Sequence, residues 1–276
     1  MSFRTYRQVG GPDESGIAEQ VSAQRARVRR QLRAVRRIVA VMSGKGGVGK
    51  SFATAALARL AATRWPGRVG VLDADLRSPT VARLLEAAGP LRVADAGVQP
   101  ATGAAGVRVI STEFLLESGR PLVWREPDAD QFVWRGALET AVLREFLGDV
   151  LWGDLELLLV DLPPGADGVA DLRELVPQLT GVFAVTIPTD EARQSVARAL
   201  HAAAAAGIRL LGVIENMVGY RCSDCGHTGP LFPGSAGVGL AAEFEIPLLA
   251  RIPFLAPPGA TALDEAESAR VFEVIG

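Results

Sequence analysis

The sequence Gly44-Lys45-Gly46-Gly47-Val48-Gly49-Lys50-Ser51 decides the fold of this chain. It fits the pattern G-x-x-x-x-G-K-[ST], in which glycines leave room for backbone N–H groups around phosphate oxygens. An apolar run over residues 38–42 precedes it, and an Ala- and Leu-rich helical segment over residues 50–62 follows it. This order predicts a phosphate-binding loop. We expect the loop and the next residue to contact ATP: Gly44, Lys45, Gly46, Gly47, Val48, Gly49, Lys50, Ser51 and Phe52.

Both lysines of the chain lie in this loop. The sequence has 29 basic residues, of which 27 are Arg and two are Lys, Lys45 and Lys50. A lysine ammonium is a compact charge with three donors, whereas the planar arginine fork would crowd the loop. We therefore expect Lys50 to neutralise the β- and γ-phosphates and the Ser51 hydroxyl to reach Mg²⁺.

Strands and helices alternate along the rest of the chain, which predicts a doubly wound, mostly parallel sheet flanked by helices. Ligands of such sheets bind beyond the carboxyl ends of the strands. Asp75, Asp161 and Asn216 end or follow strands, so we expect them to meet the glycine loop. Asp161 would support Mg²⁺. The further strands are expected over 68–75, 107–111, 155–161, 181–187, 210–216 and 248–252, and the further helices over 17–36, 79–88, 131–147, 169–179, 190–206, 235–244 and 261–274.

Composition is that of an ordinary globular protein. The 276 residues are 49% apolar and 22% charged, which is enough for a large domain with a sizeable core. The N-terminus lacks the apolar core of a signal peptide, and no apolar run reaches the roughly 18 residues of a membrane span. We expect a cytoplasmic protein without a membrane partner.

Residues 1–37 differ in charge from the rest of the chain. They carry nine Arg against three acidic residues, a balance of +6 within a total of −2. We interpret residues 1–37 as an Arg-rich helical arm and residues 38–276 as the nucleotide-binding domain. The arm either packs its apolar stripe on that domain or binds nucleic acid, anionic lipid or an acidic partner. Packing is the commoner outcome, so nucleic acid is not an expected partner.

A cysteine pair, Cys222-x-x-Cys225, follows the strand that ends at Asn216. Two thiolates at this spacing chelate one metal centre but supply half of a tetrahedral shell. The other half must come from His227, from a partner protein or from the same pair in a second subunit of a two-fold dimer. We interpret residues 217–234 as a metal-binding insertion. Its residues fit either a [4Fe–4S] cluster or zinc.

These motifs together resemble the Mrp/ApbC family of ATPases, which assemble and carry iron–sulfur clusters. The resemblance runs from about residue 38 to the C-terminus. Lys45, directly after the first glycine, also resembles a lysine of the MinD/ParA class that reaches the nucleotide of the partner subunit. The matching segments are the glycine loop, Asp73-Ala74-Asp75, Trp134-Arg135-Gly136, Trp152-Gly153-Asp154-Leu155, Asp161-Leu162-Pro163-Pro164-Gly165, Glu215-Asn216-Met217 and the cysteine pair.

The resemblance implies a role for each matched residue. In a homodimer, Lys45 would act across the interface, Lys50 would bind phosphate, and Asp75 would orient the attacking water. Ser51 and Asp161 would hold Mg²⁺, and Asn216 would contact adenine. The roles of the cysteines follow in the same way: Cys222 and Cys225 would share a [4Fe–4S] cluster with the same pair of a second subunit. The chain would then be an ATPase that delivers this cluster to apo iron–sulfur proteins.

Three positions depart from the family pattern. Ala166-Asp167-Gly168 stands where Thr-Gly-Asp is usual, Phe52 replaces a Thr, and Arg77-Ser78 replaces an aromatic–Gly pair. We therefore expect slow hydrolysis. The alternative is a ParA-like positioning ATPase that binds DNA or an acidic surface through the Arg-rich arm, with zinc or no metal at the cysteines.

Overall fold

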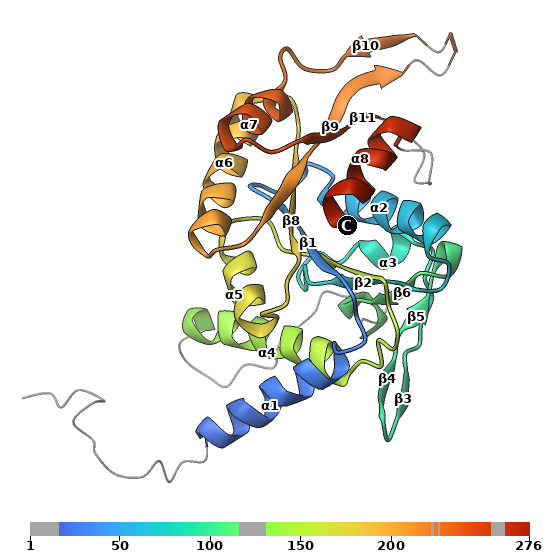
Figure 1. Ribbon diagram of the computed structural model, residues 1–276, viewed down its shortest axis with the longest axis vertical. Coiled ribbons are helices and arrows are strands. Elements are labelled where there is room, and N and C mark those ends of the chain that lie inside the picture. Colours follow the sequence, from blue (N-terminus) through green and yellow to red (C-terminus); the bar gives the residue numbers. More distant parts are fainter. Residues whose placement is uncertain (1–16, 116–130, 222–223, 226, 255–262) are drawn as a thin grey trace, which may run out of the picture.

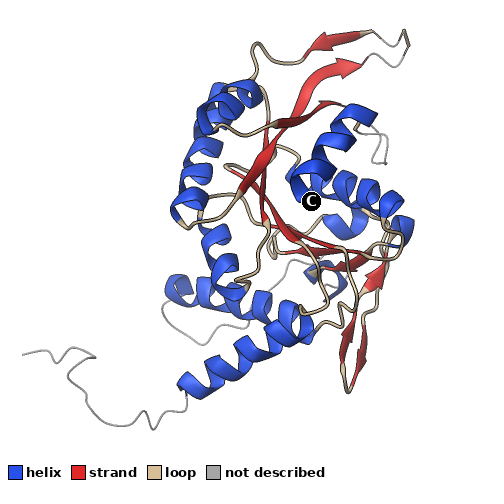
Figure 2. Ribbon diagram, in the orientation of Figure 1, coloured by secondary structure: helices blue, strands red, loops and turns tan. Residues whose placement is uncertain are grey.

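The computed structural model describes residues 17–115, 131–221, 224–225, 227–254 and 263–276. A single large sheet lies between two layers of helices (Figure 1, Figure 2). This architecture confirms the predicted α/β class with a doubly wound, mostly parallel sheet. Within the described residues no helix is both long enough and apolar enough to cross a bilayer.

The central sheet has nine strands in the part of the chain that is described, and all are parallel except the short β5 and β10. A separate two-stranded hairpin consists of β3 (Arg92–Ala94) and β4 (Gly97–Gln99). The order across the central sheet is β10 (Thr228–Pro230), β9 (Leu210–Arg221), β8 (Gly181–Thr186), β1 (Ile38–Ser43), β7 (Leu157–Asp161), β2 (Val69–Asp73), β6 (Arg108–Ile110) and β5 (Ala101–Thr102), and β11 (Leu248–Phe254) pairs with β9.

The apolar strands supply two cores, one on each face of the sheet. In β1, Ile38, Ala40 and Met42 belong to one core, while Val39 and Val41 belong to the other, because successive side chains of a strand point to opposite faces. Both faces are covered, which explains why these strands are continuous apolar runs rather than alternating ones. One layer contains α2 (Lys50–Arg64), α3 (Val81–Leu84) and α8 (Glu265–Ile275), and the other contains α1 (Ile17–Gln31), α4 (Gln131–Asp149), α5 (Asp167–Leu175), α6 (Asp190–Ala205) and α7 (Ala236–Phe244).

Some boundaries differ from the sequence prediction for local reasons. The helix expected over 79–88 is one turn long, because Glu86 adopts a left-handed conformation (φ 54°) that ends it. The strand expected over 210–216 continues to Arg221, because β10 and β11 pair with its far end. Short strands and two 3₁₀ helices, Ala104–Gly106 and Thr112–Leu115, occupy a region that the sequence left without a clear prediction.

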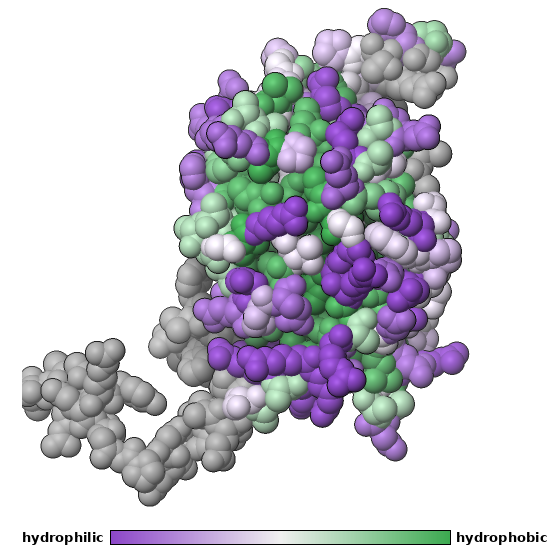
Figure 3. Space-filling view, viewed as in Figure 1, coloured by the Kyte–Doolittle hydropathy of each residue, from purple (hydrophilic) through white to green (hydrophobic). Residues whose placement is uncertain are grey.

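The described part of the Arg-rich arm packs into the domain. Val28, Leu32 and Val35 are buried in the core that also contains Leu143 and Leu147 of α4, whereas Arg29 in α1 and Arg33 in the turn after it are exposed. Figure 3 shows the resulting hydrophilic surface over the end of the molecule where α1 lies. Over residues 28–35 the structure thus has the packed arrangement of the two that the sequence left open. The division of the chain at residue 37 stays a prediction.

We predict that Leu32→Ala lowers the free energy of unfolding by about 2–5 kcal/mol, because Leu32, in the turn directly after α1, is 1% exposed and its truncation leaves a cavity. The matched control, Arg29→Ala in the last turn of α1, replaces an exposed side chain and should change the free energy of unfolding by less than about 0.5 kcal/mol. Urea unfolding of both full-length variants measures this. Equal, small losses would show that the segment at the end of α1 is not part of the cooperative unit.

Candidate functional site

The glycine loop connects β1 to α2 and leaves open space in front of its backbone. A Cβ added at Gly46 or Gly47 would meet no atom within 4 Å. Gly47 and Gly49 both have φ of 79°, a left-handed conformation that glycine adopts without strain. The Gly46 and Gly47 positions can therefore admit a ligand close to the main chain, as phosphate binding requires.

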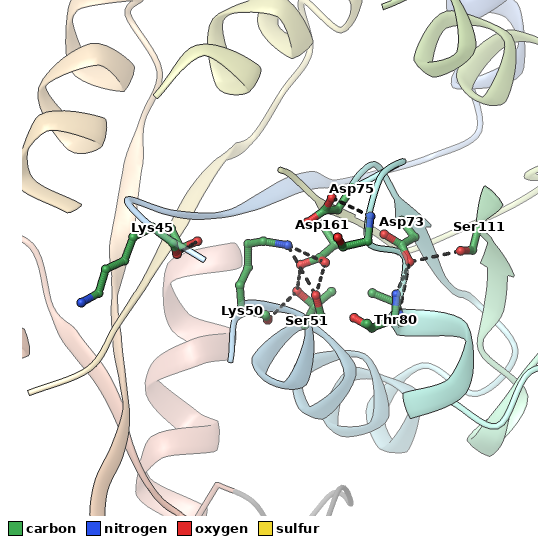
Figure 4. A network of polar contacts seen from close by, with 12 residues as sticks. Lys45, Lys50, Ser51, Asp73, Asp75, Thr80, Ser111 and Asp161 are labelled. Carbon is green, nitrogen blue, oxygen red and sulfur yellow. Dashed lines mark hydrogen bonds and ion pairs between the residues drawn. The ribbon is translucent and has the colours of Figure 1, made fainter. Parts of the chain in front are cut away.

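The carboxylate of Asp161, at the end of β7, is the centre of the site (Figure 4). Its Oδ2 accepts hydrogen bonds from Lys50 Nζ and from the Ser51 hydroxyl, each at 2.6 Å. Its Oδ1 accepts one from the Thr54 hydroxyl at 2.6 Å. Asp161 is fully buried and Lys50 is 6% exposed, so the ion pair lies out of water. The structure thus brings together Lys50, Ser51 and Asp161, as the sequence predicted.

Asp73 is a second buried carboxylate beside Asp161, and the sequence analysis gave it no role. The two residues are direct partners in the parallel pairing of β2 with β7. Oδ2 of Asp73 accepts the N–H groups of Thr80 and Val81 and the hydroxyl of Ser111, while Oδ1 has no partner within the described structure. Burial first, and the charge of Asp161 second, raise the pKa of Asp73 to about 7.

This arrangement has the oxygen ligands that suit Mg²⁺. The Ser51 hydroxyl and the Asp161 carboxylate converge, and the unpaired buried Oδ1 of Asp73 is a polar atom that a nearby cation or its water would satisfy. One ammonium, that of Lys50, serves two neighbouring carboxylates. The residues therefore fit an additional cation.

Asp75 lies at the opening of the site. It is half-buried, its Oδ1 accepts the N–H of Ser78 at 3.2 Å, and burial raises its pKa although Lys50 acts in the opposite direction. Together with the glycine loop, Asp75 lines a cleft of about 600 Å³, within the usual range for ligand sites. Arg77, next in the same segment, pairs with Glu139 of α4 at 2.6 Å.

The other residues that the sequence predicts to contact nucleotide lie around this cleft. Lys45 lines it, but its side chain points away from the Lys50–Asp161 cluster (Figure 4). Phe52 also lines it and packs on the core of α2. Asn216 is 4% exposed and donates from Nδ2 to the carbonyl of Val48 at 3.0 Å. Its contact with adenine stays a prediction.

The cysteine motif is described in part. Cys225 is an exposed free thiol between β9 and β10, and His227 is exposed. Cys222 lies outside the described residues, so the pairing of the two thiols stays a prediction. Among the described residues, no group of three or more His, Cys, Asp or Glu is arranged to hold a metal ion.

Sequence reasoning missed Thr54 and Ser111 as well as the role of Asp73. Thr54 had a usable signal, because it lies one helical turn after Lys50 and so shares its face of α2. Ser111 follows β6, two strands away from Asp161 in the sheet, and its contact depends on how β2 and β6 are placed. No local sequence pattern indicates the contact of Ser111 with Asp73.

Comparisons with known proteins agree with this geometry. The ParA-type family model described as NUBPL iron-transfer P-loop NTPase matches residues 34–273. An iron-sulfur cluster carrier protein of Saccharolobus solfataricus is 35% identical over 91% of this chain and 82% of its own length. The cytosolic Fe-S cluster assembly factor CFD1 of Chaetomium globosum is 40% identical over 79% of this chain and 74% of its own length.

Solved structures give the same result for the fold. A nucleotide-binding protein from Archaeoglobus fulgidus in complex with ADP has a TM-score of 0.69 and 30% identity, covering 90% of this chain and 93% of that one. The cell division ATPase MinD of Pyrococcus furiosus has a TM-score of 0.56 and 21% identity, covering 87% and 99%, a likeness of fold. With the glycine loop, the Lys50–Asp161 pair and the match over residues 34–273, this chain belongs to the NUBPL iron-transfer family of P-loop NTPases.

Proposed function

We propose that this chain is a slow, homodimeric ATPase of the cytoplasm that carries a [4Fe–4S] cluster and delivers it to apo iron–sulfur proteins. The observation that carries the proposal is that β9 joins the two sites: Asn216 contacts the glycine loop, and the same strand leads to the cysteine motif. The names of the relatives, an iron-sulfur cluster carrier and a cytosolic Fe-S cluster assembly factor, support it.

The cluster would be cargo held between two subunits. Cys222 and Cys225 offer two thiols, and an iron–sulfur cluster of this type needs four. The described residues add no further group of metal-binding side chains, and Cys225 is exposed, so a second copy can approach it. A two-fold axis would place two pairs face to face. Zinc at the same thiols is the alternative occupant.

The nucleotide would be bound by rearranging the contacts around Asp161. Lys50 now donates to Asp161, and a bound phosphate would offer it a second anion. Ser51 and Asp161 would hold Mg²⁺, which supplies neutralisation of the β- and γ-phosphate charge. Asp75, at the cleft opening, would orient the attacking water and accept a hydrogen bond from it. Burial raises the pKa of Asp75, which makes this carboxylate a stronger base than an exposed one.

Lys45 would act on the nucleotide of the partner subunit. Its side chain points away from the Lys50–Asp161 cluster of its own chain, which supports action across a dimer (Figure 4). Two unit charges about 4 Å apart at an effective dielectric of 20 interact by roughly 4 kcal/mol. That is enough to couple nucleotide state to dimer formation. Slow turnover is expected because Ala166 lacks the hydroxyl that the family usually has there.

The cargo is tested by anaerobic reconstitution with iron and sulfide. We expect broad visible absorption with about two iron atoms per chain, as one shared four-iron cluster requires. The double variant Cys222→Ser/Cys225→Ser should lose both signals, whereas His227→Ala should keep them because thiols of two subunits complete the shell. Stoichiometric zinc without iron uptake would contradict the carrier and favour the ParA-like alternative.

The roles of Lys45 and Lys50 are tested by measuring Mg·ATP binding and turnover of single variants and of mixed variant chains. Lys50→Ala should weaken binding of Mg·ATP, because the phosphates lose their buried cation. Lys45→Ala should keep binding but lose turnover, and Asp75→Asn should also lose turnover. Mixed in equal amounts, the Lys45→Ala and Asp75→Asn chains should regain about a quarter of the wild-type rate, because half of the dimers would contain one complete site. A mixture no more active than its parts would exclude action across the dimer.

The pKa of Asp73 gives a test of the cation site. Burial raises the pKa of Asp73 to about 7 in the chain without nucleotide, and a bound cation would lower that pKa. Below about pH 7, binding must therefore release the proton of Asp73. For each unit by which the pH is lowered, the affinity of the wild type for Mg·ADP should fall by up to about tenfold more than that of Asp73→Asn. The ratio of the two proteins removes the titration of the nucleotide itself. Titration calorimetry between pH 5.5 and 8.5 measures both affinities. If they depend on pH in the same way, the bound cation does not lie near Asp73.

A further inference from the structure

Strand β9 changes character at Met217. From Leu210 to Asn216 it lies inside the sheet, paired with β8 and β11, and residues 211–216 are buried. From Gly219 onward it pairs with β10, Tyr220 keeps one pairing with Phe254 of β11, and Tyr220 is exposed. In Figure 1 this second half extends beyond the helical layers together with β10. Met217 is therefore the junction between a fixed strand and a protruding hairpin.

The fixed half contacts the nucleotide loop directly. Asn216 donates from Nδ2 to the carbonyl of Val48 at 3.0 Å. A Cβ on Gly49 would come within 2.1 Å of the same Nδ2, so the loop backbone and this amide pack without space between them. A displacement of Val48 or Gly49 on phosphate binding must therefore be met at Asn216.

Glu215 prevents the fixed half from sliding. It is fully buried, and its carboxylate accepts hydrogen bonds from the Ser235 hydroxyl, the Gly237 N–H and the Arg251 guanidinium. These donors come from the start of α7 and from β11, on two sides of the strand. A buried carboxylate with three donors is costly to disturb. Movement at Asn216 is thus directed along the chain toward Met217.

Met217 has the backbone conformation of a pivot. Its φ is 55°, in the left-handed region that a methionine rarely adopts. The pairing of β11 with β9 shifts register opposite this point, between Ile252 and Phe254. Such strain persists only where the surroundings determine it. Here the surroundings are the Glu215 and Asn216 contacts on one side and, on the other, the pairing with β10 and with Phe254 of β11.

We propose that Met217 is the residue that positions the cysteine hairpin according to the state of the glycine loop. Through Asn216, nucleotide binding changes the balance of strain at Met217, and the hairpin that bears Cys225 turns about this residue. The inference rests on the proposed function in one respect: the cysteines are taken as the cargo site. Met217 touches neither nucleotide nor metal in this proposal and acts only through its backbone.

The test uses the reactivity of the exposed Cys225 thiol in the full-length, metal-free chain. Iodoacetamide labelling, followed by mass spectrometry of the peptide that contains Cys225, gives the rate with and without saturating Mg·ADP. We expect the wild-type rate to change about fivefold or more, a usual size for coupling between sites. Met217→Gly, which adopts φ of 55° without strain, should bind Mg·ADP as the wild type does and lose this change.

Two controls separate the backbone from other effects. Glu245→Gly relieves the same kind of strain (φ 54°) at the end of α7 and should keep the wild-type response. Met217→Ala keeps the strained backbone but removes the side chain, and should also keep the response. A Met217→Gly chain that responds like the wild type would overturn the proposal, and so would equal losses in Met217→Ala and Met217→Gly.

The outcomes also distinguish this inference from the proposed function. A wild-type chain that takes up the iron–sulfur cluster but shows no nucleotide effect at Cys225 would refute the pivot alone. A chain that takes up no cluster but shows the effect, lost in Met217→Gly, would refute the cargo and leave the pivot standing.

Discussion

The nucleotide site depends on the burial of one charge, the carboxylate of Asp161. No part of it is exposed, and three donors from the first two turns of α2 satisfy it: Lys50, Ser51 and Thr54. An unpaired charge at this depth would cost several kcal/mol, so the end of β7 and the start of α2 are held together. The end of the glycine loop that leads into α2 is consequently fixed against the end of β7.

The same charge sets the electrostatics of its neighbours. Asp73 lies opposite Asp161 in the sheet, and one lysine cannot neutralise two buried carboxylates. Asp161 is paired with Lys50, and Asp73 is left with a pKa near 7 and an unpaired oxygen. A divalent cation resolves this imbalance, because it stabilises both anions at once. The charges of the protein are therefore compatible with a cation beside Asp73.

Much of the fold and of the glycine-loop site could be predicted from the sequence. The remaining features depend on contacts between residues that are far apart in the chain. The apolar run before Asp161 and the spacing of Lys50 and Ser51 predict the strand, the loop and their meeting, because each is a local pattern with a fixed geometric consequence. The role of Asp73 was not predicted, since its pKa depends on strand register. Short strands such as β3 and β10 were missed because three residues carry too little pattern. The extension of β9 was missed because its partners lie elsewhere in the chain.

The glycines of the loop show how one motif serves two purposes. Gly46 and Gly47 face open space, where the ligand approaches. Gly44 and Gly49 instead face protein: a Cβ on Gly44 would lie 2.1 Å from the backbone of Ser195 in α6, and one on Gly49 would meet Asn216. The loop is therefore held between α6 and β9 at its two ends while its centre is free for phosphate. Because β9 continues from Asn216 toward Cys225, the close packing at Gly49 connects the glycine loop to the strand that leads to the cysteine hairpin, and a side chain at Gly49 would displace Asn216.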